Sequence, residues 1–193
     1  MRRYLFWGSI VTVFFLLLFL IAGRLGRNEP VASNCTARAV LDNEYFPVAL
    51  KEIKHAKKTI DLMMFELVYY PGHKGPSNQL INALIDAKKR GVRVRIIVEG
   101  GERFLGNRFV RKVRRTIDYI MPFGIHIRRD SRGKTTHSKL LIVDTTDVLV
   151  GSTNWSYYSL AKNHETNVLI KSKALAKDFT QYFTKIWSKG VNP

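Results

Sequence analysis

Cysteine is almost absent from this sequence of 193 residues, in which Cys35 is the only one. A single cysteine excludes a disulfide within one chain and any zinc site built from several cysteines. Cys35 falls in a segment without a sustained hydrophobic period. We interpret it as an incidental thiol, with a bridge between two chains as the alternative.

Acidic residues are also scarce, with 15 Asp and Glu against 32 Lys and Arg, for a net charge of +17. Residues 1–30 account for +3 of that surplus, which leaves +14 on the rest of the chain. The basicity therefore belongs to the folded part and is more than a targeting signal. Such a surplus favours polyanionic partners, either nucleic acid or an anionic bilayer surface, and charge alone does not choose between them.

Charge of either sign is missing from residues 5–22, a run of 18 residues flanked by two arginines on each side. As a helix this run spans about 27 Å, close to the bilayer core of about 30 Å. Cleavable signal peptides have shorter apolar regions and end at a small-x-small site, which this run lacks. We expect residues 1–23 to form an uncleaved membrane anchor, and a cleaved signal is the alternative.

The remainder divides into a linker and one domain. Residues 24–43 contain Gly, Pro, Ser and Asn without periodicity, whereas residues 44–190 alternate helix and strand signals. That alternation predicts an α/β fold, a layered mixed sheet flanked by helices. No internal repeat is present. We expect four helices, over 45–58, from a cap at Ser77 to Gly91, over 107–119 and over 174–187. We expect strands over 59–67, 92–99, 125–129, 140–143, 148–150 and 165–170.

Polar residues cluster at the ends of two short apolar strands, 140–143 and 148–150. His137 and Lys139 are two residues apart on an expected strand, so their side chains leave the same face. An unpaired buried charge is costly, but an imidazole and an ammonium together suit a phosphate. Asp144 ends the first strand. The turn 151–154 reads Gly-Ser-Thr-Asn, and Glu165 opens the next strand, where it can orient an imidazole.

The string His137-x-Lys139-x4-Asp144-x6-Gly151-Ser152-x-Asn154, with Glu165 downstream, resembles the signature of the phospholipase D superfamily. It is most similar to the single-motif branch, which includes small bacterial endonucleases and mitochondrial membrane-anchored members. The resemblance covers about Tyr45 to Trp187, and the specific motif occupies only His137 to Glu165. Unlike some anchored relatives, the chain lacks the cysteines of a zinc finger.

The resemblance implies a role for each motif residue. His137 is the expected nucleophile, which forms a phosphohistidine intermediate. Lys139 and Asn154, helped by Ser152, are expected to bind the non-bridging oxygens, and Glu165 to orient His137. Asp144 and Gly151 are expected to be structural. No cluster of carboxylates accompanies the motif, so we expect no metal and no other cofactor.

The leaving oxygen needs a proton, which a second copy of the motif supplies in this superfamily. This chain has one copy, so we expect a homodimer in which His137 of two subunits meets in a shared active site. His126 or His164 acting within one chain is the alternative.

Basic residues are concentrated just before the motif. The segment from Arg103 to Lys134 holds ten Lys and Arg, including Arg128 and Arg129, against two Asp. We expect a positive groove that binds substrate phosphates, which favours an endonuclease acting on nucleic acid. One alternative is a phospholipase D that hydrolyses or transfers phospholipid headgroups. Another is a non-catalytic anion-binding module, and the basic segment could also be only a solvated helix face.

The flanking charges of the expected anchor nearly balance, and the α-amino group favours a cytoplasmic N-terminus. The domain is then on the non-cytoplasmic side. Asn154-Trp155-Ser156 and Asn34-Cys35-Thr36 match glycosylation acceptors, and a glycan on Asn154 would block the site. A eukaryotic secretory lumen is therefore disfavoured, which leaves a bacterial envelope or periplasm, or an organelle surface.

Overall fold

The computed structural model describes residues 34–100, 105–130 and 134–193. The expected anchor over residues 5–22 lies outside these residues. Among the residues that are described, no helix combines the length and the apolar character needed to cross a membrane.

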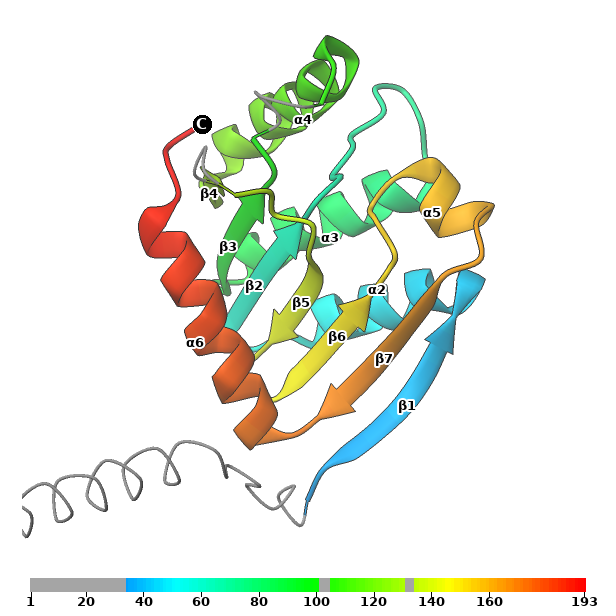
Figure 1. The fold of residues 1–193 in the computed structure, drawn as a ribbon, viewed down its shortest axis with the longest axis vertical. Coiled ribbons are helices and arrows are strands. Elements are labelled where there is room, and N and C mark those ends of the chain that lie inside the picture. Colours follow the sequence, from blue (N-terminus) through cyan, green and yellow to red (C-terminus); the bar gives the residue numbers. More distant parts are fainter. Residues whose placement is uncertain (1–33, 101–104, 131–133) are drawn as a thin grey trace, which may run out of the picture. The chain divides into compact units, whose positions relative to one another are not determined.

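Seven strands form one sheet (Figure 1). The sheet is mixed, as the sequence predicts, and it contains the six expected strands and one more, β1. Their order is β1-β7-β6-β5-β2-β3-β4. The neighbours β2, β3 and β4 run parallel, and every other neighbouring pair is antiparallel. The strand bounds are Thr36–Leu41 (β1), Thr59–Met64 (β2), Arg93–Val98 (β3), His126–Arg129 (β4), Lys139–Val143 (β5), Asp147–Gly151 (β6) and Thr166–Lys171 (β7).

Helices cover both faces of this sheet, which gives three layers (Figure 1). The helix α6 packs on one face, and the other helices contribute to the core on the opposite face. The helix bounds are Tyr45–His55 (α2), Pro76–Lys89 (α3), Asn107–Ile120 (α4), Tyr157–Ala161 (α5) and Lys173–Lys189 (α6), with short 3-10 turns at Asp42–Glu44 (η1) and Met121–Phe123 (η2).

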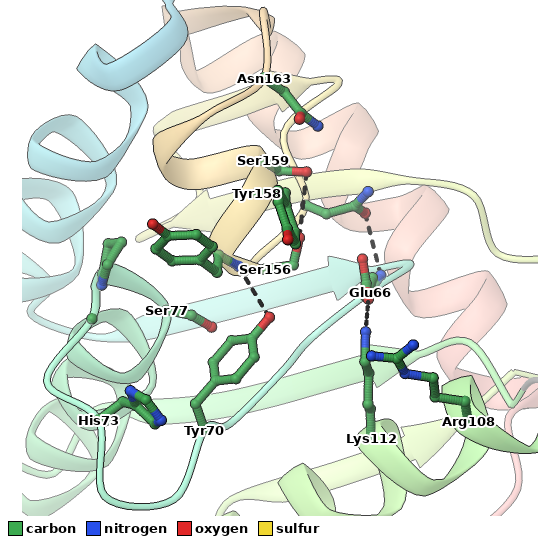
Figure 2. A pocket seen from close by; sticks show the side chains of 14 residues that line it. Glu66, Tyr70, His73, Ser77, Arg108, Lys112, Ser156, Tyr158, Ser159 and Asn163 are labelled. Atoms are coloured by element: carbon green, nitrogen blue, oxygen red, sulfur yellow. Dashed lines mark hydrogen bonds and ion pairs between the residues drawn. The ribbon is translucent and has the colours of Figure 1, made fainter.

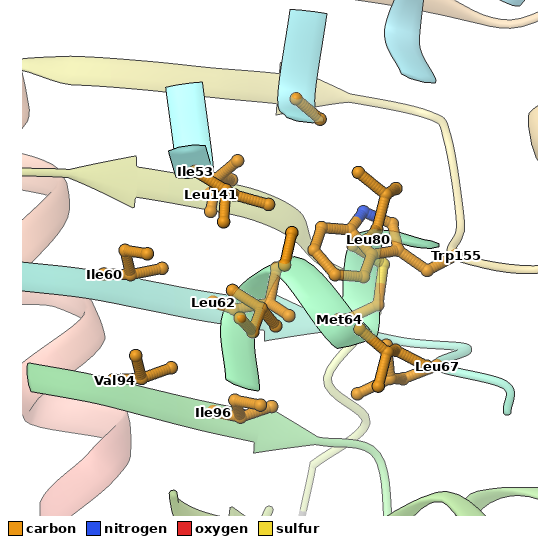
Figure 3. Packing of buried hydrophobic residues seen from close by; sticks show 14 of the residues in the cluster. Ile53, Ile60, Leu62, Met64, Leu67, Leu80, Val94, Ile96, Leu141 and Trp155 are labelled. Atoms are coloured by element: carbon orange, nitrogen blue, oxygen red, sulfur yellow. The ribbon is translucent and has the colours of Figure 1, made fainter. Parts of the chain in front are cut away.

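The central strand β2 shows how the two cores are divided. Its side chains alternate in direction, as they must on a pleated strand. Leu62 and Met64 belong to the larger core beneath α2 and α3 (Figure 3), whereas Met63 belongs to the smaller core beneath α6. The α6 face also holds a buried ion pair between Asp61 and Arg95, at 2.7 Å.

Four expectations were wrong in detail. The predicted linker contains β1, an edge strand that pairs antiparallel with β7 and exposes every residue except Val40. Only one of its six side chains is buried, and two of its apolar residues are alanines, so the segment carries no strong hydrophobic signal for a strand. The strand expected over 59–67 ends at Met64, and the helix expected over 45–58 ends at His55. Ser77 does not cap α3, whose cap is Gly75. Its buried hydroxyl donates to the carbonyl oxygens of Val68 and Trp155 instead.

The sheet brings the motif to one edge. Met64, at the carboxyl end of β2, is paired with Lys139, at the start of β5. Gly151, at the end of β6, is paired with Asn167 near the start of β7. Because neighbouring strands end or begin at this edge, residues far apart in the sequence become neighbours.

Candidate active site

Phe65, directly after β2, contacts both basic residues of the motif. The imidazole of His137 packs against the Phe65 ring at 4.7 Å between centroids, and the Lys139 ammonium lies 4.9 Å from the centre of the same ring. The Phe65 amide donates to the Ser138 carbonyl at 3.0 Å, which fixes the aromatic ring beside the motif. No local pattern in the sequence predicts this role, because Phe65 is more than 70 residues from His137.

His137 and Lys139 differ in exposure. β5 begins at Lys139, so His137 precedes the strand on which it was expected and is exposed to solvent. Lys139 is only 5% exposed, and its ammonium donates to the His137 carbonyl oxygen at 2.8 Å. Burial lowers the pKa of Lys139 below that of an ordinary lysine, although the charges of Glu165 and Glu66 act in the opposite direction.

The turn after β6 depends on Gly151. A β-carbon at this position would overlap the Thr166 carbonyl oxygen and the Asn167 side chain, and would lie 2.6 Å from the Asn167 Cα. The two segments therefore approach more closely than any other residue allows. Just beyond, the Ser152 amide donates to the Thr166 carbonyl, and the Thr166 amide donates to the Ser152 hydroxyl oxygen, both at 3.0 Å.

Glu165 is buried next to Ser152. Its carboxylate accepts hydrogen bonds from the Ser152 hydroxyl and from the Asn163 amide, the latter at 3.3 Å. Its backbone amide donates to Asp42 at 2.7 Å. Glu165 is thus fixed beside the motif and charged near Lys139. Among the described residues no hydrogen bond joins it to His137, so the orienting role of Glu165 stays a prediction.

Trp155, which is fully buried, fixes the position of Asn154. Its indole N–H donates to the Tyr45 hydroxyl at 3.0 Å, and its backbone amide donates to the Glu66 carbonyl at 3.0 Å. The Asn154 side-chain oxygen accepts from the Glu66 amide at 3.3 Å. Glu66 in turn pairs with Lys112 on α4, at 3.2 Å. Asn154 is therefore connected to β2 and α4 as well as to its own turn.

Asp144 has the geometry of a structural residue. Its carboxylate accepts from the amides of Lys57, Lys58 and Thr59 at 2.8, 2.7 and 2.9 Å, so it binds the start of β2 to the end of β5. Burial alone would raise its pKa. The three backbone donors and the Lys58 charge outweigh that effect and lower the pKa below its usual value. The contacts agree with the structural role expected for Asp144.

The other histidines proposed as acids lie elsewhere. His164 is exposed, with its Nδ1 atom 3.4 Å from the Asp42 carboxylate on the surface. His126 begins β4 and is also exposed. Neither has a contact with His137 among the described residues. No group of three or more potential metal ligands is found in that part of the chain either.

The two arginines expected to bind substrate make contacts with the C-terminal segment. The Arg128 guanidinium lies 4.9 Å from the centre of the Trp187 ring and donates to the Trp187 carbonyl. The Arg129 backbone exchanges two hydrogen bonds of 2.9 Å with Val191. Substrate binding by this pair stays a prediction. The helix α4 instead exposes four arginines to solvent, Arg108, Arg111, Arg114 and Arg115.

A cavity of about 680 Å³ opens beside the motif (Figure 2). The motif contributes Asn154 to its wall, and the loop before α3 contributes Tyr70 and His73. The sequence did not predict this cavity. The available signal was two pairs of tyrosines, Tyr69-Tyr70 after β2 and Tyr157-Tyr158 at the start of α5. The described residues that line it are Glu66, Tyr70, His73, Gly75, Pro76, Ser77, Arg108, Lys112, Asn154, Ser156, Tyr157, Tyr158, Ser159 and Asn163.

Comparison with known proteins identifies the family. Residues 49–187 match the family model described as cardiolipin synthase, PLD-like domain. The chain belongs to the phospholipase D-like family. The match spans all the motif residues, so the resemblance in the sequence is confirmed, and the chain is a hydrolase of the phosphodiesterase type. A non-catalytic binding module is not supported.

Individual relatives of this phospholipase D-like chain differ in their names. The mitochondrial cardiolipin hydrolase of Xenopus laevis is 25% identical over 164 residues, covering 83% of this chain and 71% of the relative. The virion nicking-joining enzyme of Vaccinia virus (strain Western Reserve) is 30% identical over 118 residues, covering 58% of this chain but only 26% of the viral protein. The crystal structure of Nuc from Salmonella typhimurium, a phospholipase D family member, has a TM-score of 0.69 and 28% identity over 83% of this chain and 99% of that chain.

Proposed function

We propose that this phospholipase D-like protein is a membrane-anchored phosphodiesterase that cleaves nucleic acid. The observation that carries the proposal is the row of exposed arginines on α4, next to a cavity that the motif residue Asn154 also lines. A strand of nucleic acid presents a phosphate at every nucleotide, so it gains from an extended row of cations. A single lipid headgroup does not need such a row.

The proposed reaction has two displacements at phosphorus. In the first, an imidazole nitrogen of His137 bonds to phosphorus, the bond from phosphorus to the leaving oxygen breaks, and an acid protonates that oxygen. In the second, water attacks phosphorus, the phosphorus–nitrogen bond breaks, and the water proton returns to the acid. Lys139 and Asn154 stabilise the charge on the non-bridging oxygens in both steps. No step requires a metal or another cofactor.

A second copy of the chain is the proposed source of the acid. His137 is exposed, so it is accessible to the equivalent residue of another subunit. We therefore expect a homodimer with a shared active site. The expected anchor over residues 5–22 holds the domain on the non-cytoplasmic side of a bacterial membrane, or on an organelle surface. A chain that stays monomeric and fully active would contradict the shared site.

Phospholipid is the second candidate substrate. It is favoured by the similarity to a mitochondrial cardiolipin hydrolase over 83% of this chain. The exposed arginines would in that case contact anionic lipid.

One comparison of substrates tests the proposal. The full chain, purified in detergent, is incubated in EDTA with single-stranded DNA or RNA and, after reconstitution, with cardiolipin vesicles. We expect cleavage of the nucleic acid, loss of that cleavage in His137→Ala, and affinity that falls by about 10³–10⁵ between 50 and 200 mM salt if about 6–10 phosphates are bound. Turnover of the lipid alone would overturn the nucleic-acid assignment. Loss of activity in EDTA would overturn the metal-independent mechanism.

A further inference from the structure

The cavity beside the motif is connected to the catalytic residues at two points. Asn154 belongs to both the motif and the cavity wall, and Asn163, also in the wall, donates to the Glu165 carboxylate. A group bound in this cavity therefore lies next to the phosphate that the motif binds. The volume of about 680 Å³ is within the range of about 300–1,000 Å³ typical of small-molecule sites.

The wall of the cavity is held in place by buried hydrogen bonds. Asn78, only 4% exposed, binds the loop before α3 through three of them. Its side-chain oxygen accepts from the Tyr70 amide at 2.9 Å, and its amide nitrogen donates to the Tyr70 and His73 carbonyls at 2.7 Å each. The Tyr70 hydroxyl then accepts from the Tyr157 amide at 3.1 Å, which joins this loop to α5 (Figure 2). The cavity is thus pre-formed, which favours a specific ligand.

The chemistry of the lining indicates what the ligand is. The lining includes the rings of Tyr70, Tyr157 and Tyr158, and Pro76 is the one aliphatic ring among the described lining residues. No Leu, Ile, Val or Met lines the cavity among the residues that the structure describes, so branched aliphatic side chains offer no contact to an acyl chain there. Aromatic rings bind planar rings by stacking, and every nucleobase has such a face. Serine hydroxyls and the amide of Asn163 can bind the polar edges of a base.

The tyrosines of α5 have ring faces that are accessible. Tyr157 is 43% exposed and Tyr158 is 67% exposed. Their rings contact each other edge to face, at 5.5 Å and 77°, so the edge of one ring covers one face of the other, and the remaining ring faces are available. By contrast, Tyr69 and Tyr119 stack face to face at 3.6 Å and are not available.

Arg108 supplies a charge for the adjoining phosphate. Figure 2 shows Arg108 and Lys112 side by side on α4, pointing toward Glu66. Lys112 is paired with the Glu66 carboxylate at 3.2 Å, whereas Arg108 has no acidic partner among the described residues. Arg108 is exposed at the cavity and can pair with an anion from outside the chain.

We propose that this cavity is a nucleotide subsite next to the cleaved bond. One base of a single strand stacks on the ring face of one of the two tyrosines, Tyr157 and Tyr158, while the other tyrosine contacts it edge to face, and the phosphate of that nucleotide pairs with Arg108. The subsite rests on the proposed function, because it assumes a nucleic-acid substrate. It explains why aromatic and cationic side chains occur together in a cavity that shares a residue with the motif.

The test uses the full chain in detergent, with His137→Ala present so that the strand is bound but not cleaved. The probe is a single-stranded oligodeoxynucleotide with one 2-aminopurine, whose fluorescence is quenched by stacking, moved stepwise along the strand. We expect quenching by stacking at one position. The double variant Tyr157→Ala/Tyr158→Ala should abolish it and weaken binding about 5- to 150-fold. Tyr157→Phe/Tyr158→Phe should restore both.

Two matched controls make the test specific. Tyr182→Ala removes an equally exposed tyrosine from α6, on the other face of the sheet, and should leave quenching intact. Arg108→Ala should weaken binding and reduce the slope of log affinity against log salt by about 1, whereas Lys185→Ala should not. If the wild type cleaves the strand but the double variant binds and quenches normally, the subsite is wrong and the proposed function stands. If the wild type neither binds nor cleaves single strands, both fail.

Discussion

Replacing Gly151 by alanine tests whether close packing of two backbone segments holds the catalytic turn. The added β-carbon would overlap the Thr166 carbonyl oxygen and lie 2.6 Å from the Asn167 Cα. Because these obstacles are backbone atoms, β6 and β7 must separate. Overpacking of this kind costs about 1–3 kcal/mol. The two hydrogen bonds between Ser152 and Thr166 are strained as well, at a cost of about 1 kcal/mol, so the free energy of unfolding falls by about 2–4 kcal/mol in total.

The measurement is thermal unfolding of the full chain in detergent, together with kcat. At about 2–4 °C per kcal/mol for a chain of this length, the unfolding midpoint should fall by about 4–16 °C. A shift of the turn by 1 Å would lower kcat by about 10²-fold. Gly100→Ala is the control, since its β-carbon would meet the nearest atom at an ordinary 3.5 Å. Equal midpoints for the two variants would refute the packing argument.

Two further predictions follow from charged groups. Asp144→Asn should lower the unfolding free energy at pH 7 by about 2 kcal/mol, because the amide replaces a carboxylate that binds three backbone N–H groups. Since the folded pKa of Asp144 is lowered, this difference should begin to shrink as the pH falls below the unfolded value of about 3.9, and it should be lost as the pH falls through the lower folded pKa. Urea unfolding that shows a constant difference would contradict it. Glu66→Gln removes a charge that raises the pKa of Lys139, so the alkaline limb of kcat/KM should move to lower pH. Asp86→Asn, which removes an exposed ion pair, is the control and should change neither the unfolding free energy nor the alkaline limb of kcat/KM. If the alkaline limb does not move in Glu66→Gln, protonated Lys139 is excluded from the reaction.

The sequence predicted the parts of the fold that have a local pattern. A helix over 107–119 was expected, and α4 spans Asn107–Ile120 with Val113 and Ile117 buried. Asp144 was expected to be structural, and its left-handed backbone with φ of 52° fits a residue that ends a strand in a turn. Such features depend on residues a few positions apart, so a single sequence is enough to find them.

Features that depend on sheet order could not be predicted in this way. β1 has one buried residue and no hydrophobic alternation, and it becomes a strand only because β7 offers an unpaired edge. The contact of Phe65 with His137 arises because β2 pairs with β5, which is far away in the sequence. The cavity likewise requires α4, α5 and the loop before α3 to meet. No periodicity within one segment encodes those pairings.

Two charged residues of the site are buried, whereas the arginines of α4 that we expect to bind substrate are exposed. Lys139 and Glu165 are buried at 5% and 7% exposure, where salt screens them weakly, and their opposite charges offset each other. The arginines of α4 are exposed, where salt screens them strongly. A substrate bound mainly through the exposed arginines is therefore lost as salt rises, while the catalytic step of a substrate already bound is little affected. Under the proposed function, the buried residues can be the same for a nucleic acid and for a lipid, and we expect the exposed arginines and the tyrosines of α5 to decide which of them is bound.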